Sequence, residues 1–200
     1  MNESDKDSIG ILGGSFDPVH LGHLKLAQAA VETGCVNEVI FVPAAQAPLR
    51  DEGVRASPAH RAEMLKIALE SFKYKNEVCL FEIRRGGISY TVDTAEFLRR
   101  QYPQKKLKWI IGADHIAKLP QWKNIGRLAE IVSFICGARE NFNADTSILS
   151  DNIKVEFFKF KPIPHSSTLI REYLKNGKRN LNMLDPKVEN YIFKHKLYNT

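Results

Sequence analysis

Residues 9–23 read IGILGGSFDPVHLGH, and this stretch decides the fold. Residues 9–12 are apolar and are followed by Gly13 and Gly14, which predicts a short buried strand that ends in a tight turn. Apolar residues then recur at helical spacing over about residues 21–33, which predicts a helix directly after the turn. A strand that runs through glycines into a helix suits phosphate binding, because the helix start presents N–H groups and a positive dipole end.

The alternation of strand and helix continues along the chain. Further strands are expected at 39–42, 78–83, 107–111, 131–136 and 155–160. Helices are expected at about 57–72, 91–102, 112–130, 167–175 and 186–196. This order predicts an α/β fold, a doubly wound, Rossmann-like parallel sheet with helices on both faces and a short C-terminal helical extension. We expect a single domain over 1–200, with 1–8 as a flexible tail and 162–200 as its C-terminal helical part.

Composition excludes several classes of protein. In 200 residues, 44% hydrophobic and 26% charged side chains are ordinary for a globular protein, and they exclude a collagen, a disulfide scaffold and a wholly disordered chain. No run approaches the roughly 18 apolar residues of a membrane helix, and the polar start is unlike a signal peptide. Cys35, Cys79 and Cys136 lie far apart, so we expect reduced, buried thiols and a cytoplasmic location.

The net charge of +6 is unevenly distributed. Residues 1–100 carry 12 Lys and Arg against 14 Asp and Glu, whereas residues 101–200 carry 17 against 9. A basic half favours an anionic partner, although a solvated lysine-rich surface explains it as well. No aromatic platform motif accompanies the basic residues, so we expect no nucleic-acid partner. The lack of a long apolar run leads us to expect no membrane partner.

His20 and His23 are candidate functional residues in this first stretch of the chain. They share one face at the start of the predicted helix because they are three residues apart, and Gly22 between them leaves room for a ligand. Two imidazoles beside backbone amides suit a polyphosphate. A metal site stays open, although no third histidine or HExxH glutamate supports it, and the glycines can form a turn and nothing more. The stretch is not GxGxxG, which disfavours a redox dinucleotide.

A resemblance to a known family rests on several stretches taken together. Residues 13–23 resemble the first signature of the HxGH nucleotidyltransferase superfamily, and HSSTLIR at 165–171 resembles its ISSTxIR element. SYT at 89–91, IGAD at 111–114 and LPQW at 119–122 lie between them in the same order. The set is similar to bacterial nicotinate-nucleotide adenylyltransferases, which make deamido-NAD in NAD biosynthesis. Class I aminoacyl-tRNA synthetases share HxGH, but they are much longer and carry a KMSKS motif that is absent here.

The resemblance implies a role for each matching residue. The expected catalytic residues are His20, His23 and Arg171. The residues expected to bind ATP are Gly13, Gly14, Ser15, Phe16, Arg50, Gly112, Asp114, Arg139, Ser167 and Thr168. The mononucleotide pocket is expected to be lined by Tyr90, Thr91 and Trp122, with the nicotinate ring stacked on Trp122. Mg²⁺ is expected on the ATP phosphates, with no protein ligand assigned, and a homo-oligomer is left open.

Several of these residues could instead have a purely structural role, and the chain departs from the family pattern in two places. Trp122 also suits a core, Thr91 a helix N-cap and Asp114 a cap after Gly112. The family's Pro-Pro-His-Lys loop is replaced by APLR at 47–50, where the charge is kept but the histidine is missing. His165 stands where an apolar residue is usual, and we interpret it as a surface histidine, with a phosphate contact left open.

The implied reaction is an in-line attack of the nicotinic acid mononucleotide phosphate on the α-phosphorus of ATP, which releases pyrophosphate. The nucleophile is already an anion, so positioning and charge stabilisation suffice and no covalent enzyme intermediate is needed. The alternative is a sister nucleotidyltransferase that acts on phosphopantetheine or another phosphate acceptor.

Overall fold

A single parallel sheet forms the centre of the protein. The structure is a computed structural model that describes residues 7–48, 55–140, 142, 148–179 and 181–200. Six strands pair in the order β3-β2-β1-β4-β5-β6, and every neighbouring pair is parallel. The strands are β1 (Ser8–Gly14), β2 (Glu38–Pro43), β3 (Asn76–Val78), β4 (Lys106–Gly112), β5 (Ser133–Ala138) and β6 (Val155–Lys159). The predicted doubly wound α/β fold is confirmed.

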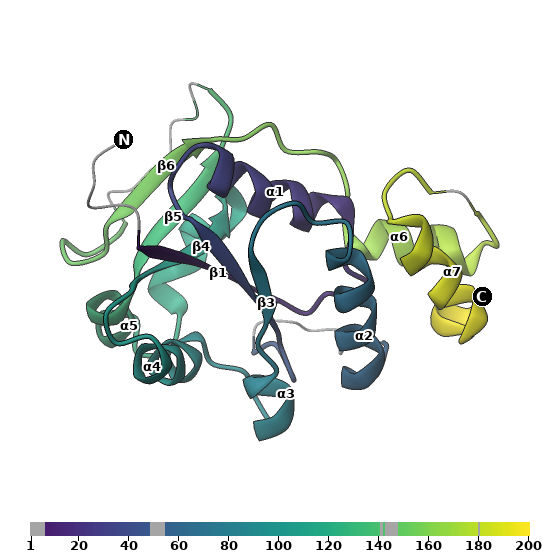
Figure 1. The fold of residues 1–200 in the computed structure, drawn as a ribbon, viewed down its shortest axis with the longest axis horizontal. Helices are drawn as coiled ribbons and strands as arrows, with labels where there is room; N and C mark the ends of the chain where they lie inside the picture. The colour runs from purple at the N-terminus through teal and green to yellow at the C-terminus, as the bar shows by residue number, and fades with distance from the viewer. Residues whose placement is uncertain (1–6, 49–54, 141, 143–147, 180) are drawn as a thin grey trace.

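Helices cover both faces of the sheet (Figure 1). One face carries α1 (Leu21–Glu32) and α2 (Pro58–Leu69), and the other carries α4 (Thr91–Gln101) and α5 (Ile125–Ile131). Two short helices, α3 (Phe81–Arg85) and η2 (Ala113–Gln121), follow β3 and β4. The C-terminal extension consists of α6 (Ser167–Lys175), α7 (Pro186–Lys194) and η3 (Leu197–Asn199), which lie together beyond α2.

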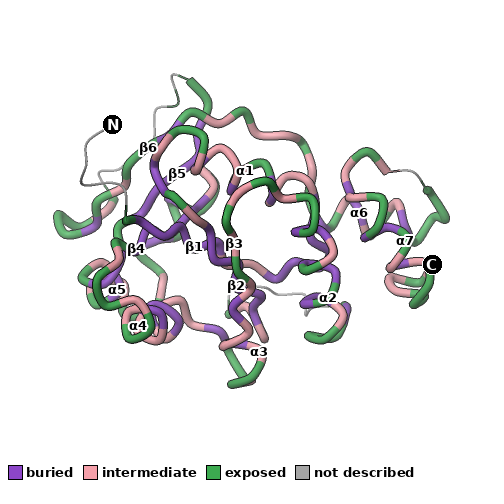
Figure 2. The backbone as a smooth tube through the Cα atoms, viewed as in Figure 1, coloured by how far each residue is buried: buried purple, intermediate pink, exposed green. Residues whose placement is uncertain are grey.

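Strand side chains alternate between two cores, as the two-residue period of a strand requires. Leu12 and Ile110 pack with α1 and α2, whereas Ile11 and Ile111 pack with α4 and α5. The middle of the sheet is therefore buried on both sides, and the exposed backbone lies mainly in the outer helices and loops (Figure 2). Ile170 and Val188 join the first core, which fixes the C-terminal extension to the body of the protein.

The site is positioned by the order of the strands. From β1 the chain continues to β2 on one side, and from β4 it continues to β5 on the other, so the β1–β4 boundary is the switch point where such sheets bind ligands. Gly13, Gly14 and Gly112 end these two strands. A Cβ on Gly13 would lie 2.9 Å from Cζ2 of Trp109, so the buried indole ring of β4 occupies the space that a side chain there would need.

Three expected boundaries differ in the structure. The strand expected at 78–83 is wrong, because pairing with β2 ends at Val78 and the chain turns into α3, where Glu82 is buried against Thr94 of α4. The strand expected at 131–136 begins only at Ser133, since Ile131 still belongs to α5. Ser8, placed in the expected tail, is the buried first residue of β1.

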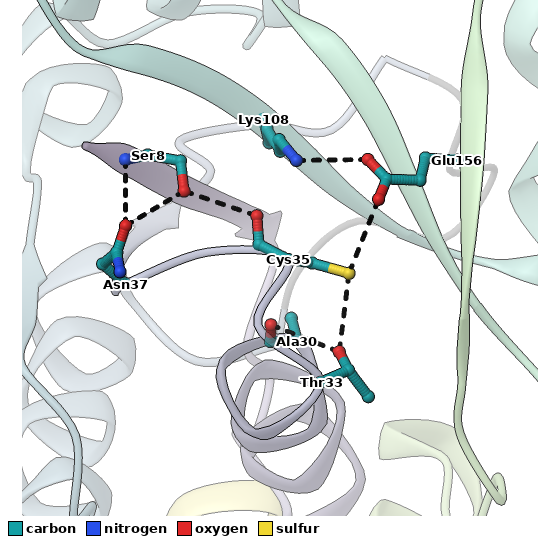
Figure 3. Close-up of polar contacts among 7 residues, drawn as sticks. All are labelled: Ser8, Ala30, Thr33, Cys35, Asn37, Lys108 and Glu156. Atoms are coloured by element: carbon teal, nitrogen blue, oxygen red, sulfur yellow. Dashed lines mark hydrogen bonds and ion pairs between the residues drawn. The ribbon is translucent and has the colours of Figure 1, made fainter. Parts of the chain in front are cut away.

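A polar network holds the amino end of the sheet, opposite the glycine turn. The Ser8 hydroxyl contacts Asn37 and the carbonyl oxygen of Cys35 (Figure 3). The Cys35 thiol lies 3.9 Å from the Glu156 carboxylate, which pairs with Lys108 at 3.1 Å. This network links β1, β4 and β6 to the end of α1, away from the predicted site.

Two expectations about cellular context concern the cysteines and the membrane. Cys35, Cys79 and Cys136 all lie among the described residues, are buried and form no disulfide, as predicted. In the described parts of the chain, no helix has the length and apolarity to cross a membrane.

Candidate active site

The loop between β1 and α1 is held by the start of α6, so the two signature stretches meet. The hydroxyl of Ser167 donates to the carbonyl oxygen of Pro18 at 3.0 Å. Nη1 of Arg171 donates to the carbonyl oxygen of Asp17 at 2.8 Å. Residues separated by about 150 positions are thereby fixed at one end of the sheet, as the resemblance requires.

His20 and His23 form a reciprocal cap at the start of α1. Nδ1 of His20 accepts from the Gly22 N–H at 3.1 Å, and Nδ1 of His23 accepts from the His20 N–H at 3.2 Å. The two ring centroids are 3.8 Å apart, and the Phe16 ring meets the His23 ring edge-on. Because each Nδ1 accepts, a neutral ring carries its proton on Nε2, which makes both histidines hydrogen-bond donors.

The environment of His20 keeps its imidazole neutral. Burial, followed by the nearby His165, lowers the pKa of His20 to about 4. At neutral pH His20 is therefore an uncharged donor in the protein without nucleotide. A bound triphosphate would favour the protonated form, because an opposite charge nearby raises an imidazole pKa.

The start of α6 places hydroxyl groups and Arg171 around the first turn of the helix. Ser166 is the N-cap and accepts from the Leu169 N–H at 3.1 Å. Thr168 is exposed and accepts from Nη2 of Arg171 at 3.2 Å. The hydroxyl of Ser167 already donates its hydrogen bond to the carbonyl oxygen of Pro18, so the backbone N–H groups of the first turn are the donors that α6 offers.

The remaining predicted ATP residues surround the switch point. Ser15 and Phe16 are buried directly after Gly13 and Gly14. Asp114 and Arg139 are exposed beyond the carboxyl ends of β4 and β5. The Asp114 side chain folds back over Gly112, so that a Cβ on Gly112 would lie 2.6 Å from Oδ1 of Asp114. Arg50 lies outside the described residues.

The predicted mononucleotide residues come together from two elements. Tyr90 is the N-cap of α4, and Thr91 is the first helical residue, so the expected Thr91 cap is wrong by one position. Trp122 ends η2 and is half-buried, with its ring edge-on to Phe134. Nζ of Lys123 lies 3.8 Å from the centroid of the Tyr90 ring, which joins the start of α4 to the end of η2.

Known proteins resemble this chain over most of its length. The sequence model of the family described as cytidylyltransferase-like matches residues 11–173. A protein of Opitutus terrae named "Probable nicotinate-nucleotide adenylyltransferase" is 41% identical over 175 residues, 88% of each chain. A protein of Halalkalibacterium halodurans with the same name is 38% identical over 96% of this chain and 91% of its own. The chain belongs to the nicotinate-nucleotide adenylyltransferase family.

The fold agrees with this family. A solved structure of Plasmodium falciparum nicotinic acid mononucleotide adenylyltransferase, complexed with NaAD, superposes with a TM-score of 0.80. The match covers 96% of this chain and 98% of the other, at 22% sequence identity.

His165, interpreted from the sequence as a surface histidine, lies next to the candidate site. His165 is half-buried, and its Cβ is 3.8 Å from the position that a Cβ on Gly22 would take. Its Nδ1 is buried and makes no hydrogen bond within the described chain, and burial, followed by Lys25, lowers its pKa. His165 therefore lies beside His20 at the site and not on a remote surface.

The sequence alone did not lead us to Arg61, a buried arginine that contacts the loops of the candidate site. Arg61 of α2 is fully buried, and its guanidinium donates to four backbone carbonyl groups. One acceptor, Ser15 at 2.7 Å, lies in the loop after β1, and two, Ala44 at 2.6 Å and Ala45 at 3.2 Å, lie in the loop after β2. The fourth, Ala56 at 3.2 Å, directly precedes Ser57, the N-cap of α2. One side chain thus fixes both loops that follow the first two strands.

A pH dependence of stability follows from the buried His20. Its pKa falls from 6.5 to about 4 on folding, so between these values the unfolded chain binds more protons than the folded chain. Stability should therefore decrease as the pH drops from 6.5 to 4, by about 3 kcal/mol for this one group. Urea unfolding at several pH values between 7 and 4 measures the loss.

The matched variant is His20→Asn. Asparagine can still accept from the Gly22 N–H as an N-cap, but it does not titrate. The variant should keep about 3 kcal/mol more of its pH 7 stability at pH 4 than the wild type does. Equal losses in the two proteins would show that His20 does not titrate as argued.

Proposed function

We propose that the protein transfers the adenylyl group of ATP to nicotinic acid mononucleotide, giving deamido-NAD and pyrophosphate. The observation that carries the proposal is the bond between Ser167 and Pro18, because it fixes the His20–His23 pair next to the start of α6 at the switch point of the sheet. The family, whose curated members carry this activity in their names, supports the choice of substrates.

The transfer needs positioning and electrostatic stabilisation. A phosphate oxygen of the mononucleotide attacks the α-phosphorus of ATP, and the bond from that phosphorus to the bridging oxygen breaks as pyrophosphate leaves. Nε2 of His20 and of His23 would donate to the phosphate oxygens, and Arg171 would neutralise the leaving pyrophosphate. Because the nucleophile is an anion before it binds, no side chain has to remove a proton.

Magnesium belongs to the proposal as the counter-ion of ATP. Mg²⁺ prefers oxygen ligands, whereas the site offers mainly imidazole, guanidinium and N–H groups. Within the described ranges, no group of three or more His, Cys, Asp or Glu side chains is arranged to hold a metal ion. The phosphates and water would hold the ion, and no step is assigned to a protein-bound metal. The buried, unpaired cysteines fit the reducing cytoplasm that the proposal assumes.

Acceptor choice tests the function. We expect kcat/KM to be about 10- to 100-fold higher for nicotinic acid mononucleotide than for nicotinamide mononucleotide. The first N–H groups of α4, at Thr91, and the ammonium of Lys123 beside Tyr90 favour a carboxylate, while the amide would turn its NH₂ toward donors. Trp122→Ala should weaken both substrates and leave their ratio nearly unchanged, because stacking does not distinguish them.

The measurement is steady-state kinetics with ATP and a panel of acceptors that includes both mononucleotides and phosphopantetheine. A preference for the amide would contradict the pocket and leave adenylyl transfer intact. A preference for phosphopantetheine would replace the proposed function by that of a sister enzyme.

A further inference from the structure

The carboxylate of Asp17 is the most heavily bonded group of the first signature, and the C-terminus of the chain supplies one of its partners. Asp17 is 1% exposed. Its Oδ2 accepts from the Arg55 N–H at 2.7 Å, and its Oδ1 accepts from the Ala56 N–H at 3.0 Å. Oδ1 also accepts from the hydroxyl of Tyr198 at 2.8 Å, across 181 positions of sequence.

The backbone is left-handed at Tyr198 and at the residue before Asp17. Phe16, directly before Asp17, has a φ of 49°, and Tyr198 has a φ of 61°. Bulky residues rarely adopt left-handed backbone, and they keep it only where the surrounding structure imposes it. The bond thus joins Tyr198, which has this conformation, to the residue that follows Phe16, which has it too.

Tyr198 also lies within the charge cluster of the phosphate site. Burial, followed by Asp17, raises the pKa of Tyr198, while the guanidinium groups of Arg171 and Arg61 act in the opposite direction. The phenol therefore stays protonated and donates a hydrogen bond to the carboxylate. Arg171 meanwhile donates to the carbonyl oxygen of the same aspartate, so one residue receives both the phenol and the guanidinium.

We propose that Tyr198 is a positioning residue for ATP, which holds Asp17 so that Arg171 stays directed at the phosphates. The phenol occupies Oδ1 of the carboxylate. Without it, a buried, partly unpaired carboxylate would lie close to Arg171 and compete with the triphosphate for the guanidinium. The proposal rests on the proposed function for the identity of the nucleotide, and it extends the site to the end of the chain.

The experiment compares Tyr198→Phe with a matched control, Tyr191→Phe. Tyr191 lies in α7, and its hydroxyl bonds to Nδ1 of His60, so the control also removes one phenol hydrogen bond from the C-terminal extension. We expect Tyr198→Phe to weaken a non-hydrolysable ATP analogue about 10- to 30-fold by calorimetry, since the bond is to a charged group. KM for ATP should rise in parallel, and KM for the mononucleotide should change by less than about twofold.

A second variant separates positioning from simple loss of stability. The double variant combines Asp17→Asn with Tyr198→Phe. The asparagine side chain would carry no charge to attract Arg171, so the double variant should bind the analogue more tightly than Tyr198→Phe alone. Hydrogen exchange at the Arg55 and Ala56 amides, which should speed up in Tyr198→Phe, reports the same coupling even where the double variant does not fold.

The outcomes are distinct for the two proposals. Analogue binding by Tyr198→Phe equal to that of Tyr191→Phe, or equal weakening of both substrates with a lower Tm, would overturn the positioning role. A wild-type protein that binds the analogue but makes no dinucleotide would contradict the proposed function alone. A wild type that does not bind the analogue would overturn both.

Discussion

Replacing His23 by alanine should lower kcat on the order of 10²–10³-fold in a protein that still folds, the usual loss for one donor to a transition state. The reason is geometric, because Nδ1 of His23 is used by the His20 N–H and its donor is therefore Nε2. Alanine also removes one half of the reciprocal cap, which should cost about 1 kcal/mol of stability. Steady-state kinetics and thermal unfolding measure the two effects separately.

His23→Gln is the matched control for this substitution. Glutamine at this third helical position can still accept from the N-cap backbone, as in the common capping box, but it has no imidazole. We expect the same loss of kcat with most of the stability retained. A folded His23→Ala protein with near-normal kcat would remove His23 from the catalytic site.

Arg61→Ala should have the largest effect on stability. The substitution leaves four backbone carbonyl groups without their donor and opens a cavity where a fully buried guanidinium lay. Unfolding free energy should fall by about 3–5 kcal/mol. For a chain of this size that corresponds to a Tm lower by roughly 10 °C.

Arg61→Lys serves as the comparison, because an ammonium keeps the charge but cannot reach four carbonyl groups in one plane. It should recover only part of the lost stability. If Arg61→Ala unfolds within about 1 kcal/mol of the wild type, the loops after β1 and β2 are held by other contacts.

The sequence predicts most clearly those features that depend on neighbouring positions. The glycine turn after β1 and the His20–His23 pair follow from short spacings, and the order of strands and helices leads to the parallel sheet. Arg61 was within reach of the same reasoning, since it shares the inner face of α2 with Met64, Leu65 and Ala68 at helical spacing. A charged residue on an apolar helix face indicates a buried charge that needs hydrogen-bond partners inside the protein.

Features that depend on distant contacts were out of reach. The bond between Asp17 and Tyr198 joins positions 181 apart, and although Asp17 belongs to the first signature, no local pattern links it to Tyr198. The apolar run at 78–83 resembles a strand, but β2 pairs only as far as Val78, and Glu82 is accommodated by Thr94 from a later helix. His165 looks like a surface residue until the turn before α6 places it beside Gly22.

The central claim is that these residues join two nucleotides. The direct measurement incubates the protein with ATP, Mg²⁺ and equal amounts of nicotinic acid mononucleotide and nicotinamide mononucleotide, and identifies the products by mass spectrometry. The account predicts deamido-NAD as the main product, formed with one pyrophosphate per dinucleotide and formed on the order of 10²–10³-fold more slowly by His23→Ala. A folded wild-type protein that yields no dinucleotide from either acceptor would contradict it.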